Sequence, residues 1–223
     1  MGHADVRLRR LSDPPIRDAA TVIVLRDGPG GARVLMGQRG AGAAFMPSKF
    51  VFPGGAVEPG DVGVSFARAL APEVRDALAR SSAIAPETLA AAALRELAEE
   101  TGQVAGRPGP PCGWPGFEGR APDAGGMRFV FRAVTPPGRP RRFDARFFLM
   151  PVETLVTDPD DFSRAEDELS HLHWVSLAEA RALDLPFVTE VALAEVAAIL
   201  AGAEQPGVPH FDNSGPGSVF RRL

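Results

Sequence analysis

Apolar residues follow two periods along the chain, and these predict strands and helices in a definite order. Residues 19–25 form a continuous run rich in β-branched side chains, which is typical of a strand buried on both faces. A turn at 27–31 follows, so this strand and the next are expected to form a hairpin. Strands are predicted at 17–26, 33–39, 127–134, 142–150 and 169–175, and helices at 64–80, 87–101, 177–183 and 187–200.

This order of elements predicts the α+β class, with a mixed sheet between helices. One domain is expected over residues 16–203, between an N-terminal arm at 1–15 and a C-terminal tail at 204–223. The tail is rich in Pro and Gly. Residues 105–126 are dense in the same two residue types and are expected to form a surface loop.

Composition and charge limit the classes of function. The chain has 223 residues, of which 45% are hydrophobic and 23% are charged, the balance of a soluble globular protein. Its net charge of −4 argues against a nucleic-acid partner, and no apolar run approaches the roughly 20 residues that span a membrane. Cys112 is the single cysteine, which excludes an internal disulfide and indicates a reducing, cytoplasmic location.

Three glutamates give the main chemical signal. Glu96, Glu99 and Glu100 stand at positions i, i+3 and i+4 of the predicted helix 87–101, so their carboxylates point to one face. Like charges this close repel one another, and a divalent cation between them removes the repulsion. Hard oxygen ligands suit Mg²⁺ or Mn²⁺. Taken alone, the same three residues are also compatible with a solvated acidic helix face.

A glycine-rich stretch upstream favours the metal interpretation. Residues 52–61 read Phe-Pro-Gly-Gly-Ala-Val-Glu-Pro-Gly-Asp. With the acidic helix, this stretch resembles the Nudix box, Gly-x5-Glu-x7-Arg-Glu-U-x-Glu-Glu-x-Gly-U, where U is aliphatic. Three features depart from that pattern: Asp61 replaces the first Glu, Gln103 replaces the last aliphatic residue, and about 62–87 is inserted. The matching residues are Gly55, Arg95, Glu96, Leu97, Glu99, Glu100 and Gly102.

The resemblance implies a fold and a reaction. The fold is the Nudix fold, an α/β/α sandwich with a mixed sheet, here with a helical insertion inside the box. The reaction is metal-dependent hydrolysis of the diphosphate linkage of a small-molecule nucleoside diphosphate derivative, with Mg²⁺ or Mn²⁺ as the cofactor. Arg95 is expected to orient a motif carboxylate. The implied metal ligands are Glu96, Glu99, Glu100 and the backbone carbonyl of Gly55.

The attacking water needs a base, and two interpretations stay open. Glu166 and Glu168, in the acidic loop before the strand 169–175, are candidates, and a Nudix-box glutamate, Glu96, is the rival. Any one of these loop carboxylates is also compatible with plain solvation. The expected catalytic set is therefore Glu96, Glu99, Glu100, Arg95 and Glu168.

Substrate contacts are predicted outside the box. Arg141 and Arg142, with Arg139, form a basic cluster that is suited to phosphates, although charge that protects an edge strand explains it equally well. Arg39 and Phe52 are also expected to contact the substrate.

The segments 45–61 and 141–148 look like one branch of the family, similar to the peroxisomal coenzyme A diphosphatase. That similarity implies coenzyme A or an acyl-CoA as the substrate. An ADP-ribose or NADH type diphosphatase is the alternative enzyme. A Nudix regulator that binds a nucleotide without cleaving it is an alternative of a different class, and the intact glutamates argue against it. A homodimer is also expected from the resemblance.

Overall fold

We describe the protein from a computed structural model, which covers residues 13–80 and 82–223. The arm predicted at 1–15 therefore lies outside the described residues except for 13–15. The helices are α1 (Pro72–Ala79), α2 (Pro86–Thr101), α3 (Leu177–Ala180) and α4 (Phe187–Leu200), with 3-10 turns η1 (Pro59–Asp61) and η2 (Val152–Thr154). The strands are β1 (Ile16–Gly28), β2 (Gly31–Arg39), β3 (Phe50–Val51), β4 (Gly54–Ala56), β5 (Gly106–Pro108), β6 (Arg120–Pro122), β7 (Arg128–Val134), β8 (Arg142–Pro151), β9 (Leu169–Ser176), β10 (Pro209–Asp212) and β11 (Val219–Arg222).

A mixed sheet organises the molecule around β1. Strand β8 runs parallel to β1 along most of its length, and β2 and β4 pair with β1 in the antiparallel direction. The order across the sheet is β11-β10-β7-β8-β1-β2-β3, with β9 paired to β2. The expected hairpin is present, because Leu25 pairs with Val34 and Gly28 with Gly31. Sheet and helices confirm the α+β class.

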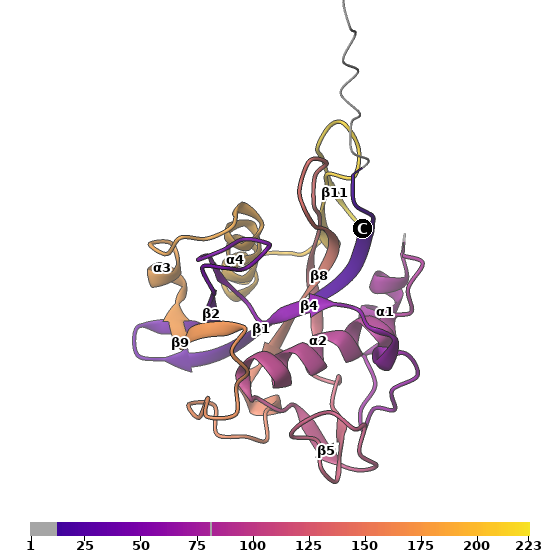
Figure 1. Ribbon diagram of the computed structural model, residues 1–223, viewed down its shortest axis with the longest axis vertical. Helices are drawn as coiled ribbons and strands as arrows, with labels where there is room; N and C mark the ends of the chain where they lie inside the picture. Colours follow the sequence, from indigo (N-terminus) through magenta and orange to yellow (C-terminus); the bar gives the residue numbers. More distant parts are fainter. Residues whose placement is uncertain (1–12, 81) are drawn as a thin grey trace, which may run out of the picture.

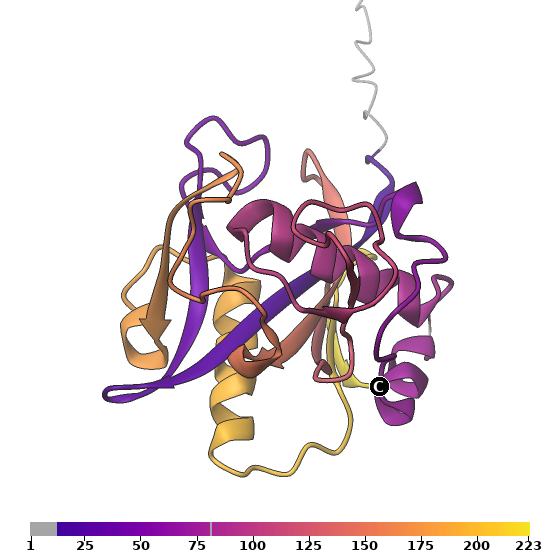
Figure 2. The same ribbon diagram turned by 90° about the horizontal axis from the view of Figure 1, so that it is seen from below.

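Helices cover both faces of this sheet. On one face α1 and α2 pack against the side chains that alternate along β1 and β8, such as Val22 and Phe148. On the opposite face α4 packs against the intervening residues, such as Ile23 and Phe147. Figures 1 and 2 show α2 and α4 on opposite sides of the strands. Within the described residues, no helix combines the length and the apolar character needed to cross a membrane.

Two helices are shorter than the sequence predicted. The helix expected over 64–80 begins only at Pro72, which occupies its first turn. Proline has no N–H to donate and disfavours helical geometry at the residue before it, so the apolar spacing upstream belongs to an extended segment. The helix expected over 177–183 ends at Ala180, and the chain continues in i→i+3 turns towards Pro186. Helices α2 and α4 match their predicted ranges within one residue.

Two segments predicted to be irregular contain strands. Within 105–126, β5 and β6 form a small antiparallel sheet. In the predicted tail, β10 pairs with β7 in parallel and β11 pairs with β10, so both extend the main sheet. Each of these strands has only three or four residues, which is too short for a clear alternating pattern.

Candidate active site

Helix α2 presents its acidic residues to the glycine turn around β4. The helix begins at Pro86, and its alanine-rich side is fully buried against the sheet. It ends at Gly102, whose φ of +71° is the left-handed conformation that suits glycine at a helix C-terminus. Because the apolar side fixes the rotation of the helix, Arg95, Glu96 and Glu100 face the turn formed by residues 54–61.

Arg95 is the hub of this arrangement. Its Nε donates to Asp61 Oδ1 at 2.8 Å, and its Nη2 reaches Asp61 Oδ2 at 3.2 Å and the Ala56 carbonyl at 3.1 Å. The side chains of Arg95 and Asp61 are almost fully buried. Asp61 also accepts the Glu58 N–H at 2.8 Å. The pair thus fixes the turn to the helix across the insertion.

Two of the three glutamates share the remaining nitrogen of Arg95. Its Nη1 donates to Glu96 Oε1 at 3.0 Å and to Glu99 Oε2 at 2.8 Å. The third, Glu100, accepts the Gly54 N–H at 2.7 Å through Oε2. The other oxygen of Glu100, Oε1, is buried and has no hydrogen-bond partner. A buried carboxylate oxygen without a donor is costly, so this atom is ready to accept a cation.

The two glycines of the turn allow the close approach of these carboxylates. A Cβ on Gly55 would lie 2.3 Å from Glu96 Oε1, and a Cβ on Gly54 would lie 2.5 Å from the Ala20 carbonyl. Gly54 has no room for a side chain because it meets backbone atoms, and a side chain on Gly55 would displace the Glu96 carboxylate. The backbone of β4 is therefore in direct contact with the carboxylate of Glu96.

Burial raises the pKa of all three glutamates. For Glu96 desolvation is the main cause, Arg95 opposes it, and the pKa is about 7. Desolvation also raises the pKa of Glu99, and it raises that of Glu100 well above its ordinary value of 4.5. The negative charges of Glu96 and Glu168 add to the increase at Glu100. The site thus holds more negative charge than its arginines offset, since the pKa of Glu96 stays raised beside Arg95 and that of Glu100 stays raised despite Arg39.

The carboxylates are close but are not arranged as a finished metal cage. Within the described part of the chain, no three His, Cys, Asp or Glu side chains are grouped to hold a metal ion. The reason is that Glu96 and Glu99 are turned to Arg95 and Glu100 is turned to Gly54. The donor set nevertheless fits Mg²⁺ or Mn²⁺, since it consists of oxygens and includes the unpartnered Oε1 of Glu100.

The acidic loop passes beside the end of α2. The Glu166 N–H donates to the Glu99 carbonyl at 2.9 Å, and the charge of Glu168 raises the pKa of both Glu96 and Glu100. Glu168 accepts a 2.6 Å hydrogen bond from Arg39 Nη2. The structure therefore brings Glu168 and Arg39, both predicted site residues, to the carboxylate cluster.

Gln103, which departs from the box pattern, holds this loop. It is fully buried. Its Nε2 donates to the carbonyls of Asp161 at 2.8 Å and Asp158 at 3.1 Å, and its Oε1 accepts from Thr157 at 2.7 Å. In the sequence, Gln103 stands out only as a departure from the box pattern. The signal was present, because a polar residue at an aliphatic position requires buried partners.

Other predicted substrate residues lie elsewhere. Phe52 is buried in the core on the α4 face of the sheet, where it packs with apolar side chains and cannot reach a substrate. Arg142 is buried, and it donates to the carbonyls of Thr135 and Ser214. Along β1, Arg142 pairs with Ile16, whereas Gly55 pairs with Ala20. These two positions are four residues apart, so at the usual rise of a strand they are separated by about 13 Å.

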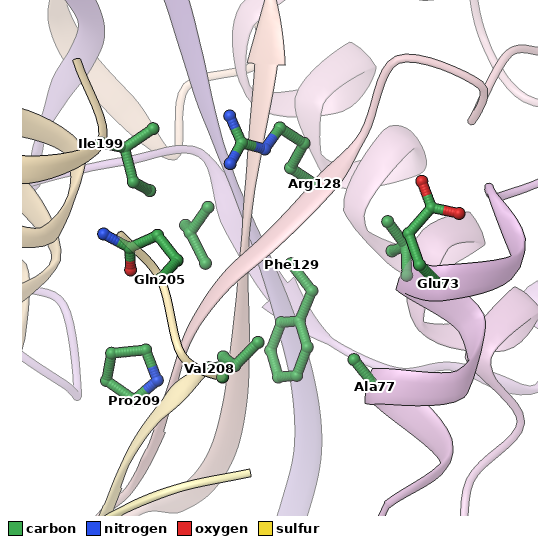
Figure 3. A pocket seen from close by; sticks show the side chains of 11 residues that line it. Glu73, Ala77, Arg128, Phe129, Ile199, Gln205, Val208 and Pro209 are labelled. Carbon is green, nitrogen blue, oxygen red and sulfur yellow. The ribbon is translucent and has the colours of Figure 1, made fainter. Parts of the chain in front are cut away.

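Arg141 lies in a separate hollow. It lines a cavity of about 250 Å³ together with Pro14, Arg17 and Phe143. A further cavity, of about 290 Å³, lies between α1, β7 and the segment after α4 (Figure 3). Glu73, Arg128, Phe129 and Gln205 line it, and none of the glutamates of α2 does. The candidate site is therefore the α2–β4 cluster, on the basis of its charges and not of cavity size.

Known proteins resemble this chain in sequence and in fold. The family model described as the NUDIX domain matches residues 85–195. A solved NUDIX hydrolase from Alicyclobacillus acidocaldarius is 32% identical, with 82% of this chain and 92% of that chain covered and a TM-score of 0.63. No curated protein matches the sequence.

Two more distant structures share the fold. A C. elegans Ap4A hydrolase in a binary complex is 16% identical, covers 84% of this chain and 99% of its own, and has a TM-score of 0.51. The NUDIX domain of Shewanella oneidensis NrtR, complexed with ADP ribose, is 14% identical. The match covers 84% of this chain and 90% of that chain, with a TM-score of 0.51. At this identity they show the fold alone.

Proposed function

Because the chain belongs to the Nudix hydrolase family, whose members act on pyrophosphate bonds of nucleoside diphosphate derivatives, we propose that it is a metal-dependent diphosphatase of this kind with its site at the α2–β4 cluster. The supporting observation is the arrangement around Arg95, which holds Glu96 and Glu99 beside the Gly54–Gly55 turn. The unpartnered oxygen of Glu100 lies in the same cluster.

Nudix hydrolases generally use divalent metals such as Mg²⁺ or Mn²⁺. In this chain Glu96, Glu99, Glu100 and the Gly55 carbonyl would hold the ion. When bound, it neutralises the diphosphate charge and lowers the pKa of a coordinated water. Arg95 acts as a positioning residue, since it sets the orientation of Glu96 and Glu99 through Nη1.

We assign the role of proton acceptor to Glu168, and we assign to Arg39 the role of orienting Glu168. Water attacks one phosphorus, the bridging P–O bond breaks, and the proton of the water passes to the Glu168 carboxylate. Glu168 is half exposed at the edge of the cluster, and its 2.6 Å bond to Arg39 holds it there. Arg39 can also contact a substrate phosphate. Glu96 is the competing base, and its pKa of about 7 suits that role.

For the substrate we propose coenzyme A or an acyl-CoA first, supported by the sequence of segments 45–61 and 141–148. The comparisons support the family and give no support to this branch. ADP-ribose or NADH is the second proposal, because the NUDIX domain of NrtR was solved with ADP ribose. We further propose a cytoplasmic homodimer with no nucleic-acid or membrane partner.

A substrate panel tests the proposal. The protein is incubated with coenzyme A, acetyl-CoA, ADP-ribose and NADH plus Mg²⁺ or Mn²⁺, and the products are separated and identified by mass. Cleavage of coenzyme A gives adenosine 3′,5′-bisphosphate and 4′-phosphopantetheine, whereas ADP-ribose gives AMP and ribose 5-phosphate. Glu168→Gln and Glu96→Gln then compare the two candidate bases. Binding of a nucleotide without any cleavage would contradict the proposal and favour a regulator.

A further inference from the structure

Strand β11 is the edge of the main sheet and carries exposed apolar side chains. Within the described residues, its neighbour in the sheet is β10, on one side only. Val219 is 50% exposed and Phe220 is 59% exposed. An edge strand with exposed apolar residues is a template for pairing with another strand, and soluble proteins normally blunt or cover such an edge.

The backbone register shows which residues of β11 face outwards. The Leu223 N–H donates to the Val208 carbonyl at 2.9 Å, so this residue points towards β10. Directions alternate along a strand, so Arg221 and Val219 also bond to β10, whereas Phe220 and Arg222 point away from it. The register agrees, since Arg222 lies opposite Pro209, which has no N–H to donate. Phe220 therefore offers both backbone groups to the open edge.

Phe220 also ends a row of aromatic rings on the α4 face of the sheet. The Phe187 and Phe211 ring centroids are 5.7 Å apart, and those of Phe211 and Phe220 are 6.3 Å apart. Phe187, at the start of α4, is 63% exposed. The row runs from α4 across β10 to the edge and leaves its two outer rings in solvent.

We propose that two copies of this chain pair through β11, antiparallel and edge to edge, about a two-fold axis at Phe220. This gives a surface to the homodimer named above and does not depend on the diphosphatase activity. Phe220 then exchanges backbone hydrogen bonds with Phe220 of the second copy, and Arg222 pairs with Ser218. The aromatic row becomes continuous from one α4 to the other.

Charge disfavours the registers shifted towards the C-terminal end of β11, and the aromatic row favours an axis at Phe220 over one at Val219. A two-fold axis in an antiparallel pair must pass through a residue that faces its own copy, because hydrogen-bonded and non-bonded pairs alternate. An axis at Arg221 or Arg222 would place like charges directly opposite each other, which is destabilising. With the axis at Phe220, Arg221 faces Val219 and Arg222 faces Ser218. Because the strand is complementary to itself, a second copy is the partner that fits.

Light scattering after size exclusion tests the interface. The wild-type protein is expected at twice the chain mass of 23.6 kDa. Phe220→Glu should give the monomer mass and keep the far-UV circular dichroism of the folded protein. Val62→Glu is the matched control, since Val62 is 66% exposed and lies in the loop after η1, so this variant should stay dimeric. A monomeric wild type, or a dimeric Phe220→Glu, overturns the proposal.

Cross-linking checks the register independently. In a Cys112→Ser background, Phe220→Cys places two thiols on the axis at a Cα separation of about 5.5 Å, which a disulfide can span. Oxidation should yield a covalent dimer. Val219→Cys should yield far less, because Val219 faces Arg221 of the other copy. Equal cross-linking of the two variants contradicts the axis at Phe220. Because neither readout uses a substrate, failure here is distinguishable from failure of the diphosphatase assignment.

Discussion

Arg95 and Asp61 form a buried ion pair across 34 positions of the chain, with Nε to Oδ1 at 2.8 Å and Nη2 to Oδ2 at 3.2 Å. The insertion at about 62–87 therefore leaves Asp61 in contact with the arginine of the motif helix. Asp61 has a shorter side chain than the glutamate of the box pattern. It still reaches Arg95, because η1 places it in the interior, where it is 1% exposed. The pair joins the turn that holds Gly55 to the helix that holds the glutamates.

Loss of this pair should reduce both stability and turnover. Asp61→Asn removes the most buried carboxylate partner of Arg95 and leaves it with Glu96 and Glu99, so we expect the free energy of unfolding to fall by about 1–3 kcal/mol. Because Arg95 then no longer holds Glu96 and Glu99 in place, kcat should fall about 10- to 100-fold with a smaller change in KM. Urea unfolding and steady-state kinetics measure the two effects. Asp76→Asn, on the exposed side of α1, is the control. Unchanged kcat in Asp61→Asn would count against the positioning role.

Gly55→Ala should damage the site through a single methyl group. Its Cβ would lie 2.3 Å from Glu96 Oε1, so the carboxylate must move. We expect a loss of about 1–3 kcal/mol in stability, as for other overpacked positions, together with most of the activity. Gly60→Ala, whose Cβ meets nothing within 4 Å, should behave as wild type. Full activity in Gly55→Ala would mean that Glu96 has no fixed place beside the turn.

Gln103 should act on the reaction through the acidic loop. Gln103→Met keeps the volume but leaves the carbonyls of Asp158 and Asp161 without their donor, at a cost of about 1–3 kcal/mol. We expect faster proteolysis within 157–168 and a kcat lowered about 10-fold, with Mn²⁺ affinity unchanged. Limited digestion measures the proteolysis, steady-state kinetics measure kcat, and a metal titration measures the Mn²⁺ affinity. Gln205→Met is the control. A loop that resists digestion as well as wild type does would refute this role.

The pKa of Glu96 makes the stability of the metal-free protein depend on pH. Its pKa rises from 4.5 to about 7 on folding, so the folded state binds more protons within that interval. The stabilisation is complete below pH 4.5 and is lost as pH rises through about 7, by at most on the order of 3 kcal/mol. Thermal melts in EDTA across this interval should show a smaller decline for Glu96→Gln than for wild type.

His210 also makes stability depend on pH, so the effect of Glu96 must be read from the difference between wild type and Glu96→Gln. Burial lowers the pKa of His210 to about 4, so its contribution to stability is present above pH 6.5 and is lost as pH falls. That slope has the opposite sign to the slope of Glu96. It is shared by wild type and Glu96→Gln, so it cancels in the difference. Identical pH profiles for the two proteins would show that Glu96 has no raised pKa.

The sequence predicted the elements that have long, regular patterns. The β1–β2 hairpin and α2 and α4 follow from apolar periodicity, and Gly102 ends α2 as a left-handed cap. Short strands such as β10 and β11 were not predicted, because four residues show too little alternation of apolar and polar side chains. Their formation depends on pairing with a neighbouring strand.

Part of the site could be predicted and part could not. Spacing on one helix face placed Glu96, Glu99 and Glu100 together. The basic residues around the start of β8 gave no such constraint, and Arg142 donates its hydrogen bonds to backbone carbonyls. Phe52 was misassigned for a similar reason, since sequence does not tell which face of the sheet a short strand end presents. The Gln103 contacts join segments more than 50 residues apart, which no local pattern encodes.

Binding of Mn²⁺, followed by the loss of its free EPR signal, tests the central claim most directly. The wild-type protein should take up Mn²⁺ at or below millimolar concentrations. Glu100→Gln can still accept the Gly54 N–H, so it should fold normally, but it should bind Mn²⁺ far more weakly and turn over about 100-fold more slowly or worse. Glu87→Gln, in the first turn of the same helix, should match wild type in both. No Mn²⁺ uptake by the wild type, or equal uptake by Glu100→Gln, would contradict a metal site at this cluster.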